Sequence, residues 1–458
     1  MAPDSETSAK RAELPMRLTR LRVKNFRSIA DIDIPLSPLT VLVGPNGSGK
    51  SNVVDALRFV RDVFARGLDQ AVMDREGVKI VQRWRAAGEG ITIGVTAKFY
   101  APFSEEMIEF MPALRGAKNI AEECEVNYDF TFSESAAREL VALHESIYID
   151  FGVENLQTVY VLKTETNIRV KLGKSVKRNE SEKSWLIDKK IGNSLLLPEK
   201  LMGLTNLLTP GIFIKQTDES KKNRVSMNQA IDIGDRIDKL NSLLVEQLFY
   251  TLNPSDLRQP QQTLKESPFD EKGRNLAAVL KRLSRGDMNG WHNLILALRQ
   301  AVAGFDDIEV EAVGGYLATK LIYQNDSAFH RTSYIGQESD GTIRMLGLLA
   351  ALQQEPPQSL ISIEEPEANI HPGALAVLAG VIEEASLRSQ ILVTTHSPDM
   401  LDHLPVESFL VVEKVGDTTH VGPLDASQMA SVRKRLFTPG ELFRMEGLQR
   451  QTEPESAS

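Results

Sequence analysis

The chain has 458 residues, of which 42% are hydrophobic and 25% are charged, and its formal net charge is −9. This length can hold two or three domains around a large buried core, and the absence of any run of about 18 apolar residues argues against a membrane span. A single cysteine, Cys124, excludes a disulfide framework and a cysteine-based metal site, and the negative charge argues against a protein that coats nucleic acid. We therefore predict a cytoplasmic globular protein without a membrane segment.

The first elements predicted along the chain are a strand, a second, buried strand and a helix. Residues 1–17 are polar and charged, so we expect a disordered tail and no signal peptide there. Residues 18–23 alternate apolar and polar side chains, which predicts an amphipathic strand. Residues 39–43 are apolar throughout and indicate a buried strand, and after Ser51 apolar residues recur at helical spacing.

A glycine-rich loop lies between that buried strand and the helix. Its residues are Gly44, Pro45, Asn46, Gly47, Ser48, Gly49, Lys50 and Ser51, followed by Asn52. Gly44 and Gly49 allow a tight loop whose backbone N–H groups cradle phosphate oxygens. Lys50 adds a positive charge for the terminal phosphates, and the Ser51 hydroxyl is placed to bind Mg²⁺. The alternative is a chance glycine-rich turn, which the flanking strand and helix disfavour.

The middle of the chain predicts an antiparallel lobe and a helical insertion. Residues 91–100 and 125–132 have strand patterns, whereas residues 196–302 are mostly helical in pattern, with a Pro/Gln-rich break at 253–262. Residues 168–190 are rich in Lys and Arg, so this stretch either contacts a DNA or RNA backbone or is a solvated insertion.

A second half of the site follows two later strands. Residues 360–363 form an apolar strand that ends in Glu364 and Glu365, and we expect these neighbours to point to opposite sides. Glu364 can then hold the Mg²⁺ shell while Glu365 polarises the attacking water. Taken alone, such a pair is usually a solvated strand end.

Two further signals place the carboxylates in context. Residues 391–395 predict another buried strand, and His396 at its end can contact a terminal phosphate, the alternative being a capping or core histidine. Ser339, Asp340 and Gly341 precede an apolar helix and can form a second anion site, the alternative being a plain N-cap. The order of these weak signals predicts one ATP site assembled from both ends of the chain.

These motifs together resemble the ABC-type ATPase heads of the RecF/SMC superfamily, in particular the OLD-like and Septu-like ATPases of bacterial defence. The resemblance implies an α/β P-loop head with an antiparallel β lobe and a helical insertion, using ATP and Mg²⁺. It assigns residues 44–51 to Walker A, 339–341 to the ABC signature, and Glu364 and Glu365 to Walker B with its catalytic glutamate. His396 becomes the switch histidine, and residues 367–371 the D-loop.

Some positions depart from the family pattern or stay open. Glu364 replaces the more usual aspartate, and the signature is shorter than that of transporters. Gln216 is the best candidate for the Q-loop glutamine. Arg27 resembles a family position near the nucleotide, although a salt-bridged surface arginine is the alternative.

The resemblance also predicts the organisation and the role of the protein. We expect a tail at 1–17, a first ATPase lobe at 18–175, a mostly helical insertion at 176–304, a second lobe at 305–435 and a C-terminal tail at 436–458. The heads are expected to form a homodimer or higher homo-oligomer with ATP between them.

Two roles follow from the family. The first is a sensor or regulator in antiphage defence that controls a separate nuclease or toxin, because no fused TOPRIM cluster is visible. The second is a RecF-like repair ATPase that binds DNA junctions. The C-terminal tail either docks a partner or packs on its own head.

Overall fold

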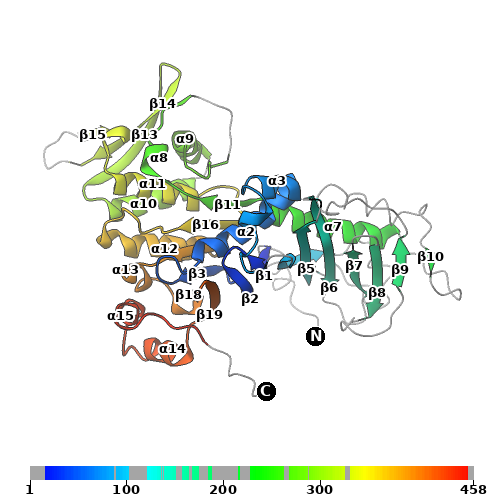
Figure 1. Ribbon diagram of the computed structural model, residues 1–458. Helices are drawn as coiled ribbons and strands as arrows, with labels where there is room; N and C mark the ends of the chain where they lie inside the picture. The colour runs from blue at the N-terminus through cyan, green and yellow to red at the C-terminus, as the bar shows by residue number, and fades with distance from the viewer. Residues whose placement is uncertain are drawn as a thin grey trace, which may run out of the picture. The chain divides into compact units, whose positions relative to one another are not determined.

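The computed structural model describes residues 16–86, 89–102, 121–135, 137, 139–150, 157–164, 168–174, 184–187, 215–216, 227–262, 268–286, 288–324 and 331–451. The chain divides into two compact units (Figure 1). The first unit contains residues 1–36, 52–246 and 415–420, and the second contains residues 37–51, 247–414 and 421–458. Of the predicted tails, residues 1–15 and 452–458 lie outside the described residues, whereas 436–451 are described. The predicted segment boundaries stay predictions.

The first unit is built on a long antiparallel arrangement of strands. In spatial order from β10 to β2 these are β10 (Lys215–Gln216), β9 (Ser184–Ile187), β8 (Ile168–Lys174), β7 (Gln157–Thr164), β6 (Leu140–Asp150), β5 (Ala121–Glu134), β4 (Ile91–Pro102), β1 (Arg17–Phe26) and β2 (Ile29–Pro35). On β1, Leu21 lies opposite Ile34 of β2 and Val95 of β4. The strands predicted at 18–23, 91–100 and 125–132 and the antiparallel lobe are therefore confirmed.

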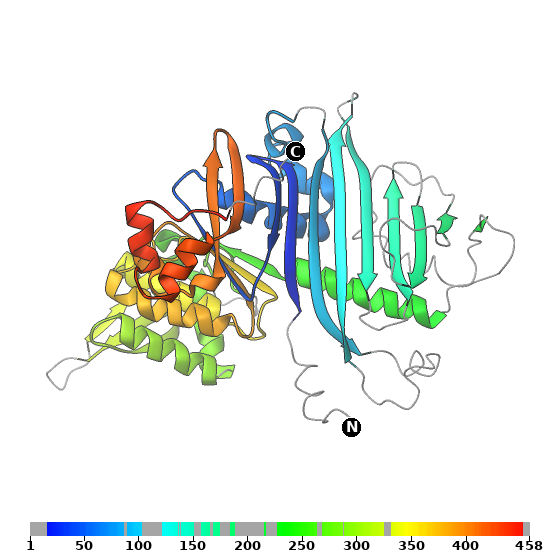
Figure 2. The ribbon, with the colours of Figure 1, turned by 90° about the horizontal axis from the view of Figure 1, so that it is seen from below.

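Helices complete the first unit, and they are α2 (Lys50–Arg66), α3 (Leu68–Met73), α4 (Val78–Val81) and α7 (Met227–Val245). Figure 2 shows α7 running across the strands of the lobe. The ring of Phe59 on α2 stacks on Phe132 of β5 at a centroid distance of 5.4 Å and tilts against Phe26 of β1 at 5.7 Å. All three side chains are buried, so an aromatic cluster fixes the helix to the sheet.

The second unit contains a parallel sheet with the spatial order β18 (Phe409–Val415), β3 (Leu39–Val43), β17 (Gln390–Thr395), β16 (Leu360–Glu364) and β11 (Gln247–Tyr250). Residues 39–43 and 390–395 are buried along their whole length, as expected of strands covered on both faces. β19 (Thr418–Pro423) follows β18 and is shared between the two units.

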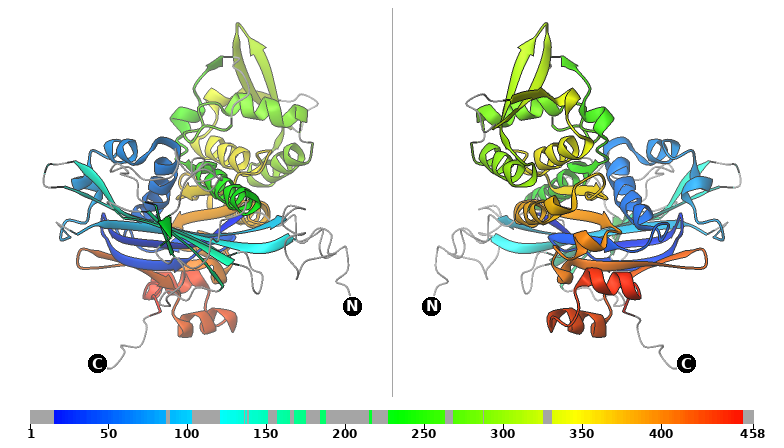
Figure 3. Two further views of the ribbon diagram at one scale, coloured as in Figure 1. Left: turned by 90° about the vertical axis from the view of Figure 1, so that its right-hand side faces the viewer. Right: turned by 90° about the vertical axis from the view of Figure 1, so that its left-hand side faces the viewer.

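Helices and a smaller sheet surround these parallel strands. The helices are α8 (Pro254–Leu257), α9 (Leu276–Gly286), α10 (Met288–Ala301), α11 (Asp340–Leu352), α12 (Leu375–Ala385), α13 (Pro398–Leu401), α14 (Ala426–Arg433) and α15 (Pro439–Met445). The smaller sheet contains β12 (Gln261–Gln262), β13 (Phe305–Val313), β14 (Tyr316–Tyr323) and β15 (Arg331–Tyr334). Figure 3 shows α11, in yellow, and the red α14–α15 segment on opposite sides of the strands.

The structure refines two expectations about the second unit. The mostly helical stretch predicted at 196–302 contains the strand β11, which pairs in parallel with β16, and residues 196–214 lie outside the described part. A strand of only four residues, Gln247–Tyr250, is too short for its periodicity to be distinguished from that of a helix, so the sequence did not reveal it. In the C-terminal segment, Leu442 of α15 is buried and the Gly440 N–H donates to the Asp402 carboxylate at 2.7 Å, which agrees with packing on its own head.

Candidate functional site

The predicted site residues follow the carboxyl ends of three neighbouring parallel strands in the second unit. The glycine-rich loop follows β3, Glu364 ends β16 with Glu365 directly after it, and His396 follows β17. The register places Val43 opposite Thr395 and Glu364 opposite Thr394, so the three strand ends lie side by side. Ligands of open α/β sheets bind at this edge, where the strand ends leave space and polar groups.

The glycines of the phosphate loop have separate roles. Gly47 and Gly49 adopt φ values of 76° and 106°, a region that residues with a side chain rarely occupy. Gly44 is required for a different reason, because a Cβ atom there would lie 2.2 Å from the Val412 carbonyl oxygen. The expectation that Gly44 and Gly49 shape the turn is therefore corrected: Gly47 and Gly49 supply the turn, and Gly44 lets the loop approach β18.

Lys50 lies at the first position of α2 and is only 6% exposed. Its Nζ atom donates to the carbonyl oxygens of Gly44, at 2.7 Å, and Pro45, at 3.0 Å. Burial lowers the pKa of this amine, while the carboxylates of Glu365 and Glu367 act in the opposite direction. The amine is held inside the loop, where its hydrogen bonds to the carbonyl oxygens can be exchanged for hydrogen bonds to a phosphate.

Ser51 and Glu364 meet across the site. The Ser51 hydroxyl donates to Glu364 Oε2 at 2.7 Å, although the two residues are far apart in sequence. A hydroxyl and a carboxylate are hard oxygen ligands of the kind that Mg²⁺ uses together with substrate phosphates and water. Among the described residues no group of three or more His, Cys, Asp and Glu could hold a metal. The pair therefore fits a Mg²⁺ ion shared with a nucleotide and does not form an all-protein cage.

Glu365 does not continue the strand as predicted. β16 ends at Glu364, and Glu365 turns into the left-handed region with φ 47° directly before Pro366. The alternation rule fails because the chain turns at Glu365, although the residue before a proline usually keeps an extended backbone. A left-handed residue with a side chain costs on the order of 1–3 kcal/mol, so the surrounding structure must hold it.

The side chains of Glu365 and His396 lie together at the surface of the site. Glu365 Oε1 is 3.1 Å from His396 Nδ1, and the two side chains are 43% and 40% exposed. Next to them, the Thr395 hydroxyl donates to Glu367 Oε1 at 2.6 Å. An accessible carboxylate beside an imidazole can orient a water molecule and shift its proton.

The predicted signature segment begins α11. Ser339 is the N-cap, and its Oγ accepts from the Thr342 N–H at 3.1 Å. Arg258, directly after α8, holds this segment by donating to the Glu338 carbonyl at 2.8 Å and lying 2.6 Å from Asp340 Oδ1. Gly341 packs so closely on the D-loop that a Cβ atom would lie 2.5 Å from the Asn369 carbonyl oxygen.

One buried arginine of this site was missed by sequence reasoning. Arg344 of α11 donates through Nη2 to the Glu365 carbonyl at 2.8 Å and through Nη1 to the Leu252 carbonyl. The available signal was a charged residue inside the apolar run at 343–352, because arginine is seldom buried unless it is paired.

Three other candidates lie in the first unit. Arg27 pairs with Asp55 at 2.6 Å, which agrees with the salt-bridge alternative. Asn52 donates through Nδ2 to the Ser28 hydroxyl at 2.6 Å. Gln216 lies in β10 at the edge of the strand order, and its Q-loop role stays a prediction.

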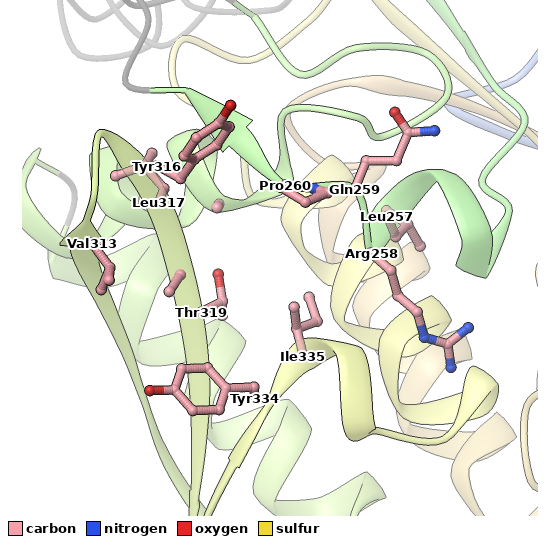
Figure 4. Close-up of a pocket in the computed structure, with 12 residues that line it drawn as sticks. Leu257, Arg258, Gln259, Pro260, Val313, Tyr316, Leu317, Thr319, Tyr334 and Ile335 are labelled. Carbon is pink, nitrogen blue, oxygen red and sulfur yellow. The ribbon is translucent and has the colours of Figure 1, made fainter.

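A separate cavity of about 230 Å³ lies between α8, α9 and the small sheet (Figure 4). Leu257, Tyr316, Tyr334 and Ile335 line it, and Arg258 joins its wall to the signature segment. The residues of the phosphate loop and of Walker B do not line it. No helix in the described part of the chain is long and apolar enough to cross a membrane.

Comparisons with known proteins place this site in a family. Residues 162–402 match the family described as "AAA domain, putative AbiEii toxin, Type IV TA system", and residues 17–74 match the RecF/RecN/SMC N terminal domain. An OLD nuclease of Thermus scotoductus is 58% identical over 43 residues, which are 9% of this chain and 8% of that protein. The Rad50 ATPase of Thermoplasma volcanium is 25% identical over 223 residues, 46% of this chain and 23% of that protein.

These matches span less than a quarter of the length of either relative. A solved Smc head bound to the C-winged helix domain of ScpA covers 90% of this chain and 99% of its own, at 15% identity and a TM-score of 0.46. A score of that size adds nothing to the fold described above. The first family model, in contrast, spans more than half of the chain. The chain therefore belongs to this AAA-domain family and is an ABC-type ATPase of the RecF/SMC/OLD-like kind.

Proposed function

We propose that this protein binds ATP with Mg²⁺ and hydrolyses it in a nucleotide-gated dimer. The observation that carries the proposal is the meeting of Lys50, Ser51, Glu364, Glu365 and His396 at three adjacent strand ends. Phosphoryl transfer needs positioned charges and an oriented water, and these residue types supply both.

Each residue has a distinct part in the proposed reaction. Lys50 exchanges the carbonyls of Gly44 and Pro45 for phosphate oxygens, and the loop N–H groups complete the cradle. Ser51 and Glu364 would hold Mg²⁺, which when bound neutralises charge on the phosphates. Glu365 polarises the attacking water, and His396, 3.1 Å from that carboxylate, is placed to sense the terminal phosphate.

The proposed dimer places the signature of one copy over the nucleotide of the other. Residues 339–341 offer a capped helix start with exposed polar groups, which suits an anion supplied by a second copy. Two composite sites then form together and open after hydrolysis.

For the biological role, we favour control of a separate nuclease or toxin in antiphage defence. The family description, which names a toxin–antitoxin system, supports this choice. The alternative is a DNA-repair ATPase, which the short matches to Rad50 and to RecF of Corynebacterium jeikeium support. Expression together with the neighbouring genes, purification and mass spectrometry of what co-purifies separate the two roles. A protein effector favours the defence role, and recovery of DNA alone contradicts that role.

The test of the ATPase itself is Glu365→Gln. We expect kcat to fall by about 10²–10⁴-fold, because the base is removed, while ATP still binds and holds a closed dimer. Steady-state hydrolysis, nucleotide binding and size-exclusion chromatography with light scattering measure the three effects. Glu383→Gln on α12 removes an equal charge from an exposed surface and serves as the control. Hydrolysis by Glu365→Gln at the wild-type rate would show that another group is the base.

A further inference from the structure

Arg344 connects two parts of the site that sequence reasoning treats as separate motifs. It lies on α11, one turn beyond the start of the signature helix, and it is 7% exposed. Its Nη2 atom donates to the Glu365 carbonyl at 2.8 Å and lies 3.4 Å from the Glu364 carbonyl. The two residues of Walker B thus share one donor on the signature helix.

The backbone that Arg344 holds needs an external restraint. Glu365 has a left-handed φ of 47° although it carries a side chain and precedes a proline. Its own N–H donates to the Thr394 carbonyl at 2.9 Å, so β17 fixes one side of this residue. The Arg344 guanidinium fixes the other side, and the direction of the Glu365 carboxylate depends on the two together.

The same arginine is anchored at a third point. Its Nη1 atom donates to the Leu252 carbonyl, just after β11. Burial lowers the pKa of the guanidinium, while Glu367 and Glu365 oppose this shift, and arginine nevertheless stays charged. A planar guanidinium bonded to three carbonyl oxygens transmits a displacement of α11 to the backbone of Glu365 better than a flexible side chain would.

The start of α11 is in turn sensitive to what binds the signature. Gly341 lies against the Asn369 carbonyl without room for a Cβ atom, and Asp340 is paired with Arg258. A phosphate received by residues 339–341 would therefore move or tighten a helix whose next turn holds Glu365.

We propose that Arg344 is a positioning residue that aligns Glu365 of its own chain when the signature receives the nucleotide held by a second copy. This inference rests on the proposed ATPase dimer. It makes hydrolysis at one composite site depend on occupancy of the other, through a link inside each chain.

The first test is Arg344→Met, which keeps an unbranched side chain and removes the fork. We expect kcat to fall by about 10²-fold, because the catalytic group is displaced, with the ATP dissociation constant changed by less than about twofold. Arg344→Lys should recover part of kcat, since an ammonium can still donate to the Glu365 carbonyl. An unchanged kcat in Arg344→Met, or a loss of kcat that merely follows a loss of ATP binding, overturns the proposal.

Arg388→Met is the matched control. Arg388 also donates to a backbone carbonyl, that of Leu352 at 2.7 Å, but at the opposite end of α11. We expect this variant to keep kcat even if its thermal unfolding temperature falls by as much as that of Arg344→Met. Equal losses of kcat in the two variants would mean that Arg344 only stabilises the helix.

A mixing experiment shows in which chain Arg344 acts. Ser339→Arg, which blocks the signature, should stay inactive when mixed with Glu365→Gln. The mixed dimer contains one site with all its catalytic groups, but the Glu365 of that site belongs to the chain whose signature receives no nucleotide. Regained hydrolysis would contradict the dependence of one site on the other. Arg344→Met should gain nothing from the same partner, because its defect lies beside its own Glu365. Rescue of Arg344→Met by mixing contradicts action within the chain. If the wild-type protein hydrolyses no ATP, the proposed function fails, whereas normal hydrolysis by Arg344→Met with a dead Glu365→Gln defeats this inference alone.

Discussion

In the phosphate loop the residues with left-handed backbone, Gly47 and Gly49, have no side chain, whereas in the Walker B turn the left-handed residue is Glu365. The loop can adopt its shape from local sequence, because glycine enters this region without steric cost. The turn cannot, because the proposed reaction needs a carboxylate at the position where the backbone is strained. The Thr394 carbonyl and Arg344 supply the restraint from distant segments of the chain.

The same difference separates the two charged residues that are proposed to act on the nucleotide. Lys50 is satisfied by the carbonyls of Gly44 and Pro45, which lie within its own loop. Glu365 is positioned through residues of α11 and β17. In the proposed ATPase, phosphate binding is thus a local property of the loop, and hydrolysis depends on how the helices pack. Substitutions in the loop should therefore weaken ATP binding, whereas substitutions around Glu365 should lower kcat.

The largest of these further effects is expected in the phosphate loop. Lys50→Ala removes a buried charge that is proposed to bond to phosphate. The free energy of ATP binding should weaken by about 1.5–3 kcal/mol, which is a roughly 10- to 150-fold loss of affinity. Titration with a fluorescent ATP analogue measures this, and Lys434→Ala, at an exposed lysine, is the control. If Lys50→Ala bound ATP normally and lost only kcat, the division between ATP binding by the loop and hydrolysis by the turn at Glu365 would be wrong.

A smaller effect is expected where the signature meets the D-loop. Gly341→Ala places a Cβ atom 2.5 Å from the Asn369 carbonyl oxygen, so the free energy of unfolding should fall by about 1–3 kcal/mol and hydrolysis should weaken. At Gly380 on α12 a Cβ atom has no atom within 4 Å, so Gly380→Ala should raise stability by up to about 1 kcal/mol. Urea unfolding of the two variants checks the opposite signs, and equal signs would mean that the contact at Gly341 is loose.

The smallest effect measures the strain at Glu365. At φ 47° glycine is easier to accommodate than alanine. The free energy of unfolding of Glu365→Gly should therefore exceed that of Glu365→Ala by about 1 kcal/mol. At the neighbouring Glu364, which lies in a strand, the order should be reversed. If urea unfolding showed alanine to be the more stable variant at both positions, the turn at Glu365 would carry no strain.

The sequence by itself determined the elements with strong periodicity and the motifs that follow them. It indicated β1, β3, β16 and β17, the helix after Ser51, and the position of His396 at a strand end, because alternation and apolar runs are local signals. It missed β11, which is too short to show a distinctive period. It also extended β16 through Glu365, because alternation alone does not reveal the left-handed turn there.

Only the tertiary structure decided how the motifs act on one another. The pairing of Ser51 with Glu364, the restraint of Glu365 by Arg344 and the contact of Gly341 with Asn369 join residues with no local relation in sequence. Such contacts depend on strand register and helix packing, which a pattern of residue types does not specify. The sequence therefore predicted a phosphate site, and the packing of α11 and β17 around β16 decided where the Glu365 carboxylate lies.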